Sequence, residues 1–146
     1  MDQTNQSIQS KKKIKLDFKD SKYATGRRKR SIAKVWVKKG SGNIHVNGLK
    51  MNEYFKRPVH QIIVTRPLEI SEIATSYDVK CSVKGGGLSG QAGAIILGIS
   101  KALISHDENF KKNLKKDKLT TRDSRIVERK KYGHRKARRS FQFSKR

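Results

Sequence analysis

The last eighteen residues of the chain, 129–146, constrain its fold more than any other stretch. Nine of their side chains are Lys or Arg and none is Asp or Glu, while only Tyr132, Ala137, Phe141 and Phe143 offer apolar surface. That surface is too small to offset the entropy of ordering the chain, so the stretch cannot fold alone. Because like charges repel, we expect an extended segment that becomes ordered beside a dense negative partner. Nucleic acid is such a partner, and a solvated tail without a specific target is the alternative.

Charge is unevenly distributed along the whole chain, whose 146 residues carry a net charge of +24. Residues 1–52 hold 14 basic and 3 acidic side chains, residues 53–110 hold 6 of each, and residues 111–146 hold 16 and 3. A near-neutral centre between two basic ends indicates a folded body with two binding surfaces. At this length we expect one domain with arms.

The composition disfavours several kinds of site and location. The single Cys81 excludes an internal disulfide and a multi-cysteine metal site, and the four histidines show no paired-ligand spacing. No apolar run approaches the roughly 20 residues of a membrane span. Residues 1–20 resemble neither a signal peptide nor an Arg-rich transit peptide. We therefore expect no metal, no cofactor, no membrane partner and a reducing intracellular compartment.

Alternating apolar residues predict the first strand over residues 31–38. Its apolar face consists of Ala33, Val35 and Val37. The turn-forming residues 40–43 follow, and residues 44–46 can return as the second strand of a hairpin. A short third strand is expected near residues 49–51.

Residues 77–84 alternate more cleanly than any other stretch, which predicts a strand with one buried face. The side chains expected in the core are Tyr77, Val79, Cys81 and Val83. A glycine-rich loop follows over residues 85–90, and residues 91–105 are apolar enough to form a core helix.

Two further helical stretches flank this centre. Pro67 lies within the apolar residues 60–71 and predicts a broken or short helix there. Residues 110–119 read as a short basic helix, and Leu119 is the last strong core candidate. We therefore divide the chain into a flexible polar and basic extension over 1–22, a globular body over 23–119 and an extended basic tail over 120–146.

The glycine loop admits three interpretations. Gly85, Gly87 and Gly90 have the spacing of a dinucleotide-binding motif, but a spacing match alone is weak and the body is short for a doubly wound sheet. The spacing also fits a P-loop, yet glutamine and alanine stand where that motif needs Lys and Ser or Thr. A tight structural turn and a turn whose amides also bind RNA phosphates, beside Lys84, stay open. A small nucleotide-binding enzyme using this loop is the alternative function, without a named acid–base pair or nucleophile.

Two smaller charge patterns complete the sequence. Residues 27–30 read Arg-Arg-Lys-Arg, immediately before the first expected strand, with no nearby acid. Asp123 and Glu128 are the only acids of the tail, and we expect them to pair with neighbouring arginines.

Three blocks of sequence together resemble one known family. The first contains Thr25-Gly26-Arg27-Arg28-Lys29, the strand after it and Val46-Asn47-Gly48. The second begins Gly85-Gly86-Gly87-x-x-Gly90-Gln91 and continues to Leu103. The third runs from Leu119 through Tyr132-Gly133 and Lys136-Ala137-Arg138-Arg139 to Ser144-Lys145-Arg146. With these blocks the chain resembles the universal small-subunit ribosomal protein nine family, in its bacterial and organellar form, over residues 23–146.

The resemblance implies a structural constituent of the small ribosomal subunit that binds rRNA in the subunit head and supports translation, and not an enzyme. It implies an α+β two-layer sandwich with a mostly antiparallel sheet of about four strands and helices on one face. The implied partners are small-subunit rRNA, peptidyl-site tRNA and neighbouring head proteins. The implied location is a cytoplasmic ribosome or, alternatively, a mitochondrial or plastid ribosome.

The resemblance also implies the residues that contact RNA. The tail of the family threads through rRNA toward the peptidyl site, so its last residues are expected beside the anticodon stem-loop of the bound tRNA: Ser144, Lys145 and Arg146. The expected rRNA contacts are the basic residues before the first strand, the glycine loop and the tail: Arg27, Arg28, Lys29, Arg30, Lys84, Gly85, Gly86, Gly87, Arg122, Arg125, Arg129, Lys130, Lys131, Tyr132, Arg135, Lys136, Arg138 and Arg139.

Overall fold

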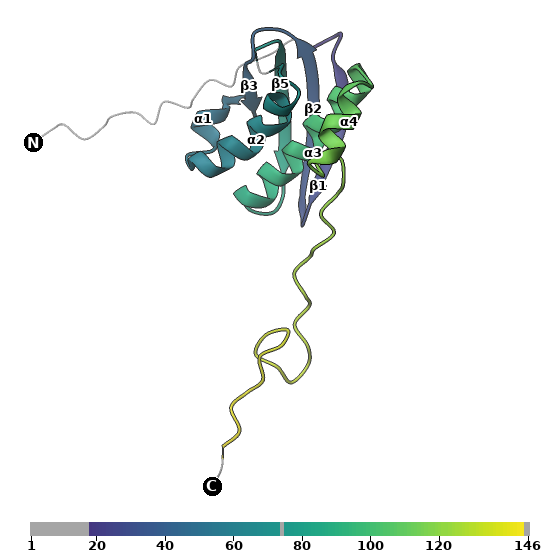
Figure 1. Cartoon of the computed structure of the whole chain (residues 1–146). Helices are drawn as coiled ribbons and strands as arrows, with labels where there is room; N and C mark the ends of the chain where they lie inside the picture. The colour runs from purple at the N-terminus through teal and green to yellow at the C-terminus, as the bar shows by residue number, and fades with distance from the viewer. Residues whose placement is uncertain (1–17, 74, 145–146) are drawn as a thin grey trace, which may run out of the picture.

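The computed structural model describes residues 18–73 and 75–144, which form a sheet covered by helices on one side (Figure 1). The strands are β1 (Lys22–Arg28), β2 (Ser31–Lys39), β3 (Ile44–Val46), β4 (Leu49–Lys50) and β5 (Tyr77–Lys84). The helices are α1 (Met51–Tyr54), α2 (Pro58–Ile70), α3 (Leu88–His106) and α4 (Phe110–Lys116). Most of the expected flexible extension over residues 1–22 lies outside the described residues.

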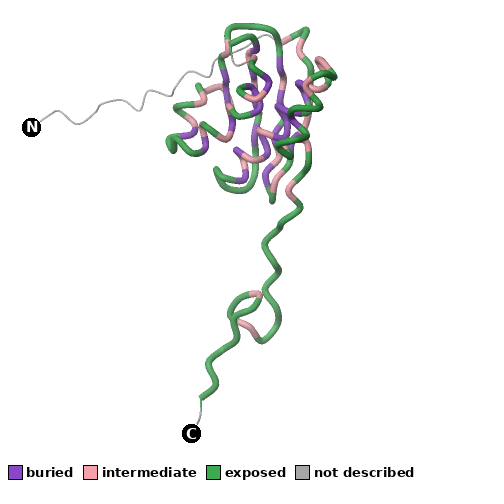
Figure 2. Tube along the Cα trace, in the orientation of Figure 1, coloured by how far each residue is buried: buried purple, intermediate pink, exposed green. Residues whose placement is uncertain are grey.

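The expected α+β two-layer sandwich is confirmed, with two differences in the sheet. The sheet has five strands, in the order β1-β2-β5-β3-β4, where about four were expected. It is mixed, because β3 runs parallel to β5 while the other neighbouring pairs are antiparallel. The buried residues concentrate where the helices meet the sheet (Figure 2).

The two strands with the clearest alternation form the centre of the sheet, as predicted. The inward side chains of β2 are fully buried, and those of β5 are at most 6% exposed. Burial raises the pKa of the Cys81 thiol above its usual range, because the thiolate would lose its hydration. Cys81 is therefore a small protonated core side chain, in keeping with its position in the alternation.

The predicted hairpin between residues 31–38 and 44–46 is wrong in its pairing. Residues 44–46 do form a strand, β3, but β5 lies between β3 and β2. Ile44 pairs with Val79 and Val46 with Cys81 in parallel. The apolar alternation of β5 makes it the best partner for both strands, and this long-range pairing replaces the local hairpin.

The predicted break at Pro67 is also wrong, since α2 continues through it to Ile70. Proline removes one amide donor from the helix, but Pro67 lies only one turn from the end. Its ring is buried beside Leu68, so packing against the core offsets the missing hydrogen bond.

The first strand of the sheet begins before residue 31, contrary to the prediction. β1 pairs antiparallel with β2 along its whole length, from Lys22 opposite Val37 to Arg28 opposite Ser31. Its basic and glycine residues concealed the alternation, because β1 is an edge strand with few apolar side chains. The basic cluster over residues 27–30 therefore lies at the end of a strand and in the turn that follows.

Helix α3 begins three residues before its predicted start and lies at the centre of the fold. It is long and apolar enough to span a membrane by length and composition alone, but 56% of that apolar window is buried inside the protein. Its buried side chains pack on β1, β2 and β5, as expected of the core helix of a globular body.

The backbone of α3 comes unusually close to β1. A Cβ atom added at Gly26 would overlap the carbonyl oxygen of Ala94 and lie 2.5 Å from the amide nitrogen of Gly98. A Cβ atom added at Gly98 would lie 2.5 Å from Cγ2 of Val35. Glycine at both positions thus allows the helix and the sheet to touch through their main chains.

We predict that Gly26→Ala lowers the free energy of unfolding by about 2–3 kcal/mol, because an added methyl group forces α3 away from the sheet. Gly87→Ala is the matched control: a Cβ atom there meets nothing within 4 Å, so its cost should stay at or below about 1 kcal/mol. Urea unfolding of both variants measures the difference. Equal stabilities would show that α3 has room to move outward without loss of packing.

Candidate nucleic-acid interface

Three basic or glycine-rich segments meet at one end of the body. Figure 1 shows the β1–β2 turn and the β5–α3 loop at the end from which the C-terminal segment departs. Residues 29 and 30 form the turn, residues 85–87 form the loop, and residues 120–128 form the start of the tail. Segments far apart in the sequence thus form one positively charged surface.

The turn and the loop support one another through tight backbone contacts. Lys29 adopts a φ of 52°, and Gly85 and Gly86 adopt φ values of 77° and 61°. The Ser31 hydroxyl donates a hydrogen bond to the Gly85 carbonyl over 3.0 Å. A Cβ atom added at Gly86 would overlap the Ser31 hydroxyl oxygen, and the positive φ disfavours other residues there in any case. The glycine loop is therefore a tight turn held against the start of β2.

A groove of about 600 Å³ runs between these segments. It is lined by Lys29, Arg30, Gly86, Gly87, Ile126 and Val127, which join the turn, the loop and the tail. A second hollow of about 360 Å³ lies beside it and is lined by Lys29, Arg57, His60 and residues 87–90. No side chain caps α3 at Gly87, and the residues that carry its first amides line this hollow. Such amides favour anions.

Arg57 and His60 were missed in the sequence analysis. They belong to the loop before α2 and to its first turn, and only the fold brings them to the start of α3. The His60 ring shares a hydrogen bond of 3.0 Å between Nε2 and the Ser89 hydroxyl. No pattern in the sequence links position 60 to position 89.

The alternation of β1 separates the four basic residues at its end. Arg27 points away from the helices and is exposed, whereas Arg28 points toward α3 and is partly buried. The Arg28 side chain passes over Gly93 and contacts the tail, while Lys29 and Arg30 lie exposed in the turn. Four consecutive cations therefore occupy three different environments.

Asp123 joins the tail to the body through Arg28 and also pairs with Arg125 of the tail itself. Its carboxylate accepts hydrogen bonds from Arg125 Nη2 at 2.9 Å, from Arg125 Nε at 3.0 Å, from the Arg125 amide at 3.1 Å and from Arg28 Nε at 3.1 Å. The hydrogen bonds from Arg125, and then that from Arg28, hold the pKa of this carboxyl well below its usual range. The expected pairing of Asp123 with a neighbouring arginine is confirmed. Arg28 has an acidic partner after all, 95 positions along the chain.

Glu128 closes a loop within the tail. Its two carboxylate oxygens accept hydrogen bonds from Arg138 Nε at 2.8 Å and from Lys131 Nζ at 2.7 Å, which lower its pKa. The Arg135 amide donates to the Arg139 carbonyl over 2.8 Å, and the Arg135 guanidinium lies 5.4 Å from the centre of the Phe141 ring. The tail departs from the body as expected, but it contains this loop and is not extended throughout (Figure 1).

The residues of the tail that were predicted to contact rRNA, all of which the structure describes, are exposed (Figure 2). Tyr132 is 103% exposed, so its ring has no packing partner in the body. Ser144 is exposed as well, and Lys145 and Arg146 lie outside the described residues. The tail thus presents cations and rings to whatever surrounds it.

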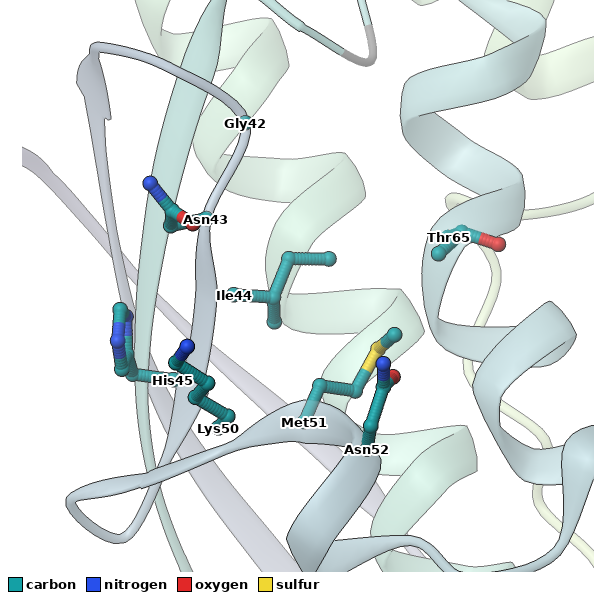
Figure 3. Close-up of a pocket in the computed structure, with 8 residues that line it drawn as sticks. All are labelled: Gly42, Asn43, Ile44, His45, Lys50, Met51, Asn52 and Thr65. Atoms are coloured by element: carbon teal, nitrogen blue, oxygen red, sulfur yellow. The ribbon is translucent and has the colours of Figure 1, made fainter.

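A further hollow lies on another part of the body, beside β3 and α1. It measures about 210 Å³, and its lining of Gly42, Asn43, Ile44, His45, Lys50, Met51, Asn52 and Thr65 contains no carboxylate (Figure 3). Ile44 and Met51 point into the hollow, while His45 lies on the other side of its strand (Figure 3). Within residues 18–73 and 75–144, no three His, Cys, Asp or Glu side chains gather as metal ligands would.

We predict that Asp123→Asn frees the start of the tail, because the amide cannot pair with two guanidinium groups as a carboxylate does. Backbone ¹⁵N relaxation of residues 122–126 should change from rigid to flexible, whereas Glu108→Gln, which removes an exposed charge elsewhere, should leave it unchanged.

The pairing of Asp123 with the two arginines also predicts how the order of residues 122–126 depends on pH. The folded pKa of Asp123 is lowered, so its stabilising effect is fully present above the ordinary carboxyl range and is lost only as the pH falls through that lowered value. Order in residues 122–126 should therefore persist when ordinary carboxyl groups have already become protonated. Loss of order near the ordinary Asp pKa would contradict the pairing.

The comparison with known families agrees with this arrangement. Residues 26–146 match the family model described as Ribosomal protein S9/S16. The matched span includes the β1–β2 turn, the glycine loop, Asp123 and the whole tail, and it leaves out only the first 25 residues. The resemblance drawn from the three sequence blocks is confirmed, and the chain belongs to the ribosomal protein S9/S16 family.

Proposed function

We propose that this protein binds small-subunit rRNA in the head of the subunit and reaches the peptidyl-site tRNA with the tip of its tail. Membership of the family establishes the coarser statement, a structural protein of the ribosome that associates with rRNA. The finer proposal rests mainly on one observation: the basic turn, the glycine loop and the start of the tail form one surface, held together by Asp123.

The rRNA would contact this basic end first. Arg27, Lys29 and Arg30 are exposed there, and the free amides at the start of α3 add a site suited to phosphate. Arg28 and Arg125 share Asp123, so in this proposal they position the tail and contact phosphate with their remaining donors. Lys84 ends β5 beside the loop, within reach of the same RNA backbone.

The tail would then continue along the RNA. Its cations outnumber its acids, and Asp123 and Glu128 are both occupied by internal pairs. The remaining exposed cations are available to phosphates, and Tyr132 can stack on a base. In this proposal residues 1–22 are an extension, 23–119 the rRNA-binding body and 120–146 the tail, on a cytoplasmic or an organellar ribosome beside other head proteins.

The topology of the sheet disfavours the nucleotide-binding enzyme. The glycine loop does connect a strand to a helix, but β5 is parallel only to β3 in a mixed five-stranded sheet. Dinucleotide sites lie where a parallel, doubly wound sheet reverses its strand order. The proposal therefore assigns the loop to RNA and not to a nucleotide cofactor.

We predict that neutralising the β1–β2 turn weakens the salt dependence of RNA binding. Lys29→Gln with Arg30→Gln removes two phosphate contacts, so the slope of log K against log salt should fall by roughly 1 to 2. The control pair Lys111→Gln and Lys112→Gln removes the same charge from exposed positions on α4. Equal slopes for both pairs would show that the turn contributes only general charge.

We predict that deleting residues 144–146 impairs tRNA binding without impairing assembly. The deletion removes two cations but no core residue, so the protein should enter the subunit normally. Two lost phosphate contacts of about 1 kcal/mol each should lower peptidyl-site tRNA affinity about 10- to 30-fold, with little dependence on tRNA sequence.

Filter binding of tRNA to purified subunits at matched salt measures the loss. Deleting residues 129–146 is the comparison, and it should also impair docking into the subunit. Unchanged tRNA affinity in the shorter deletion would restrict the tail to an rRNA anchor.

A further inference from the structure

The face of the sheet turned away from the helices carries its own ordered set of side chains. Paired residues on neighbouring strands point to the same face, so the register places them in rows. One row crosses all five strands and consists of Tyr23, Trp36, Lys80, His45 and Lys50. The adjacent rows consist of Thr25, Lys34 and Ser82, then of Arg27, Ile32 and Lys84, with Lys38 opposite Asp78 on the other side.

Aromatic rings and a lysine are in contact at the centre of this face. The Tyr23 and Trp36 ring centres are 5.3 Å apart, with their planes at 45°. Lys80 Nζ lies 5.8 Å from the Trp36 ring centre and 5.8 Å from that of Phe18. Tyr23 is 49% exposed, and its hydroxyl shares a hydrogen bond of 2.9 Å with Thr25. The pair is thus held in a fixed orientation with ring surface open to a ligand.

The same face has a large positive excess. Its cations are Arg27, Lys34, Lys38, Lys50, Lys80 and Lys84. Asp78 is the one acid in these rows, and its Oδ1 already accepts hydrogen bonds from the backbone amides of Ser41 at 3.0 Å and Asn43 at 2.8 Å. A negatively charged ligand would therefore meet attraction across the whole face.

We propose that this open face, named here the sheet platform, binds a single-stranded segment of RNA, with a base stacked on the Tyr23–Trp36 pair. The platform rests on the proposed function, which brings the protein to RNA. It adjoins the turn and the glycine loop at Arg27 and Lys84, but the Tyr23–Trp36 pair at its centre belongs to neither of them, nor to the tail. Single-stranded RNA suits it because cations hold the backbone while rings stack on unpaired bases. A duplex keeps its bases inside and could use only the cations.

The single tryptophan of the chain makes the platform directly observable, because Trp36 is the only source of indole fluorescence. The full-length protein is titrated with a single-stranded oligoadenylate, with an RNA duplex of the same length and with inorganic polyphosphate. Labelled RNA reports overall binding by anisotropy in the same samples. Saturable Trp36 quenching with the oligoadenylate, and little with the duplex or polyphosphate, is the expected result.

Substitutions separate ring stacking from charge. Tyr23→Thr keeps a residue that favours strands but removes the ring, and it should weaken oligoadenylate binding about 5- to 30-fold while leaving duplex binding unchanged. Lys34→Gln should weaken binding more than Lys112→Gln, which removes the same charge from an exposed position on α4. Circular dichroism and the unfolding midpoint confirm that each variant is folded.

The outcomes distinguish this inference from the proposed function. RNA binding without Trp36 quenching, or with Tyr23→Thr as tight as the unaltered protein, would overturn the platform and leave the proposed function standing. Trp36 quenching that increases with protein concentration but not with RNA concentration would assign the face to a second copy of the chain. That result would also overturn the platform. Absence of any RNA binding would overturn both.

Discussion

Direct contact between α3 and the backbone of β1 determines where the basic segments of this protein lie. Gly26 and Gly98 leave no side chain between helix and strand, so the helix axis is fixed close to the sheet. The glycine loop then enters the helix beside the β1–β2 turn, and Gly93 leaves room for Arg28 to cross α3 toward Asp123. Larger side chains at these glycine positions would push α3 away from the sheet and separate the turn, the loop and the tail. Their charges would then no longer add up on one surface.

Local patterns predicted those parts of the fold that depend on local burial. The alternation of residues 77–84 matched the bounds of β5, and the apolar residues after the glycine loop matched most of α3. The pairing of β3 with β5 could not be predicted in this way, because it depends on which strand offers the better partner after a long connection. Pro67 misled for a related reason: one lost hydrogen bond near a helix end is a small cost when the ring is buried.

Charge patterns predicted which residues are basic and exposed, but not what each of them contacts. Asp123 was expected to pair with a nearby arginine, and Arg125 does so. Its second partner, Arg28, lies at the end of β1, and that strand had not been recognised. Without β1 there was no alternation to separate Arg27 from Arg28, so four consecutive cations looked equivalent. The exposure of Lys29 and Arg30 was easier to predict, because a basic turn at the end of a strand lies on the surface in most folds.

Counting charges along the sequence also concealed the positive charge on one face of the sheet. Residues 53–110 contain equal numbers of acids and bases, which suggested a neutral body between basic ends. A strand places alternate residues on opposite faces, so neutrality along the sequence does not imply neutrality on a surface. Lys80 and Lys84 come from that neutral segment, while Lys34 and Lys50 come from the basic one, and the sheet register assembles them on one face. Of the acids of the segment, Asp78 lies on the same face but binds the backbone of a turn, whereas Glu69 and Glu72 lie in and after α2. The body therefore has a basic face of its own, and it arises from strand pairing rather than from local composition.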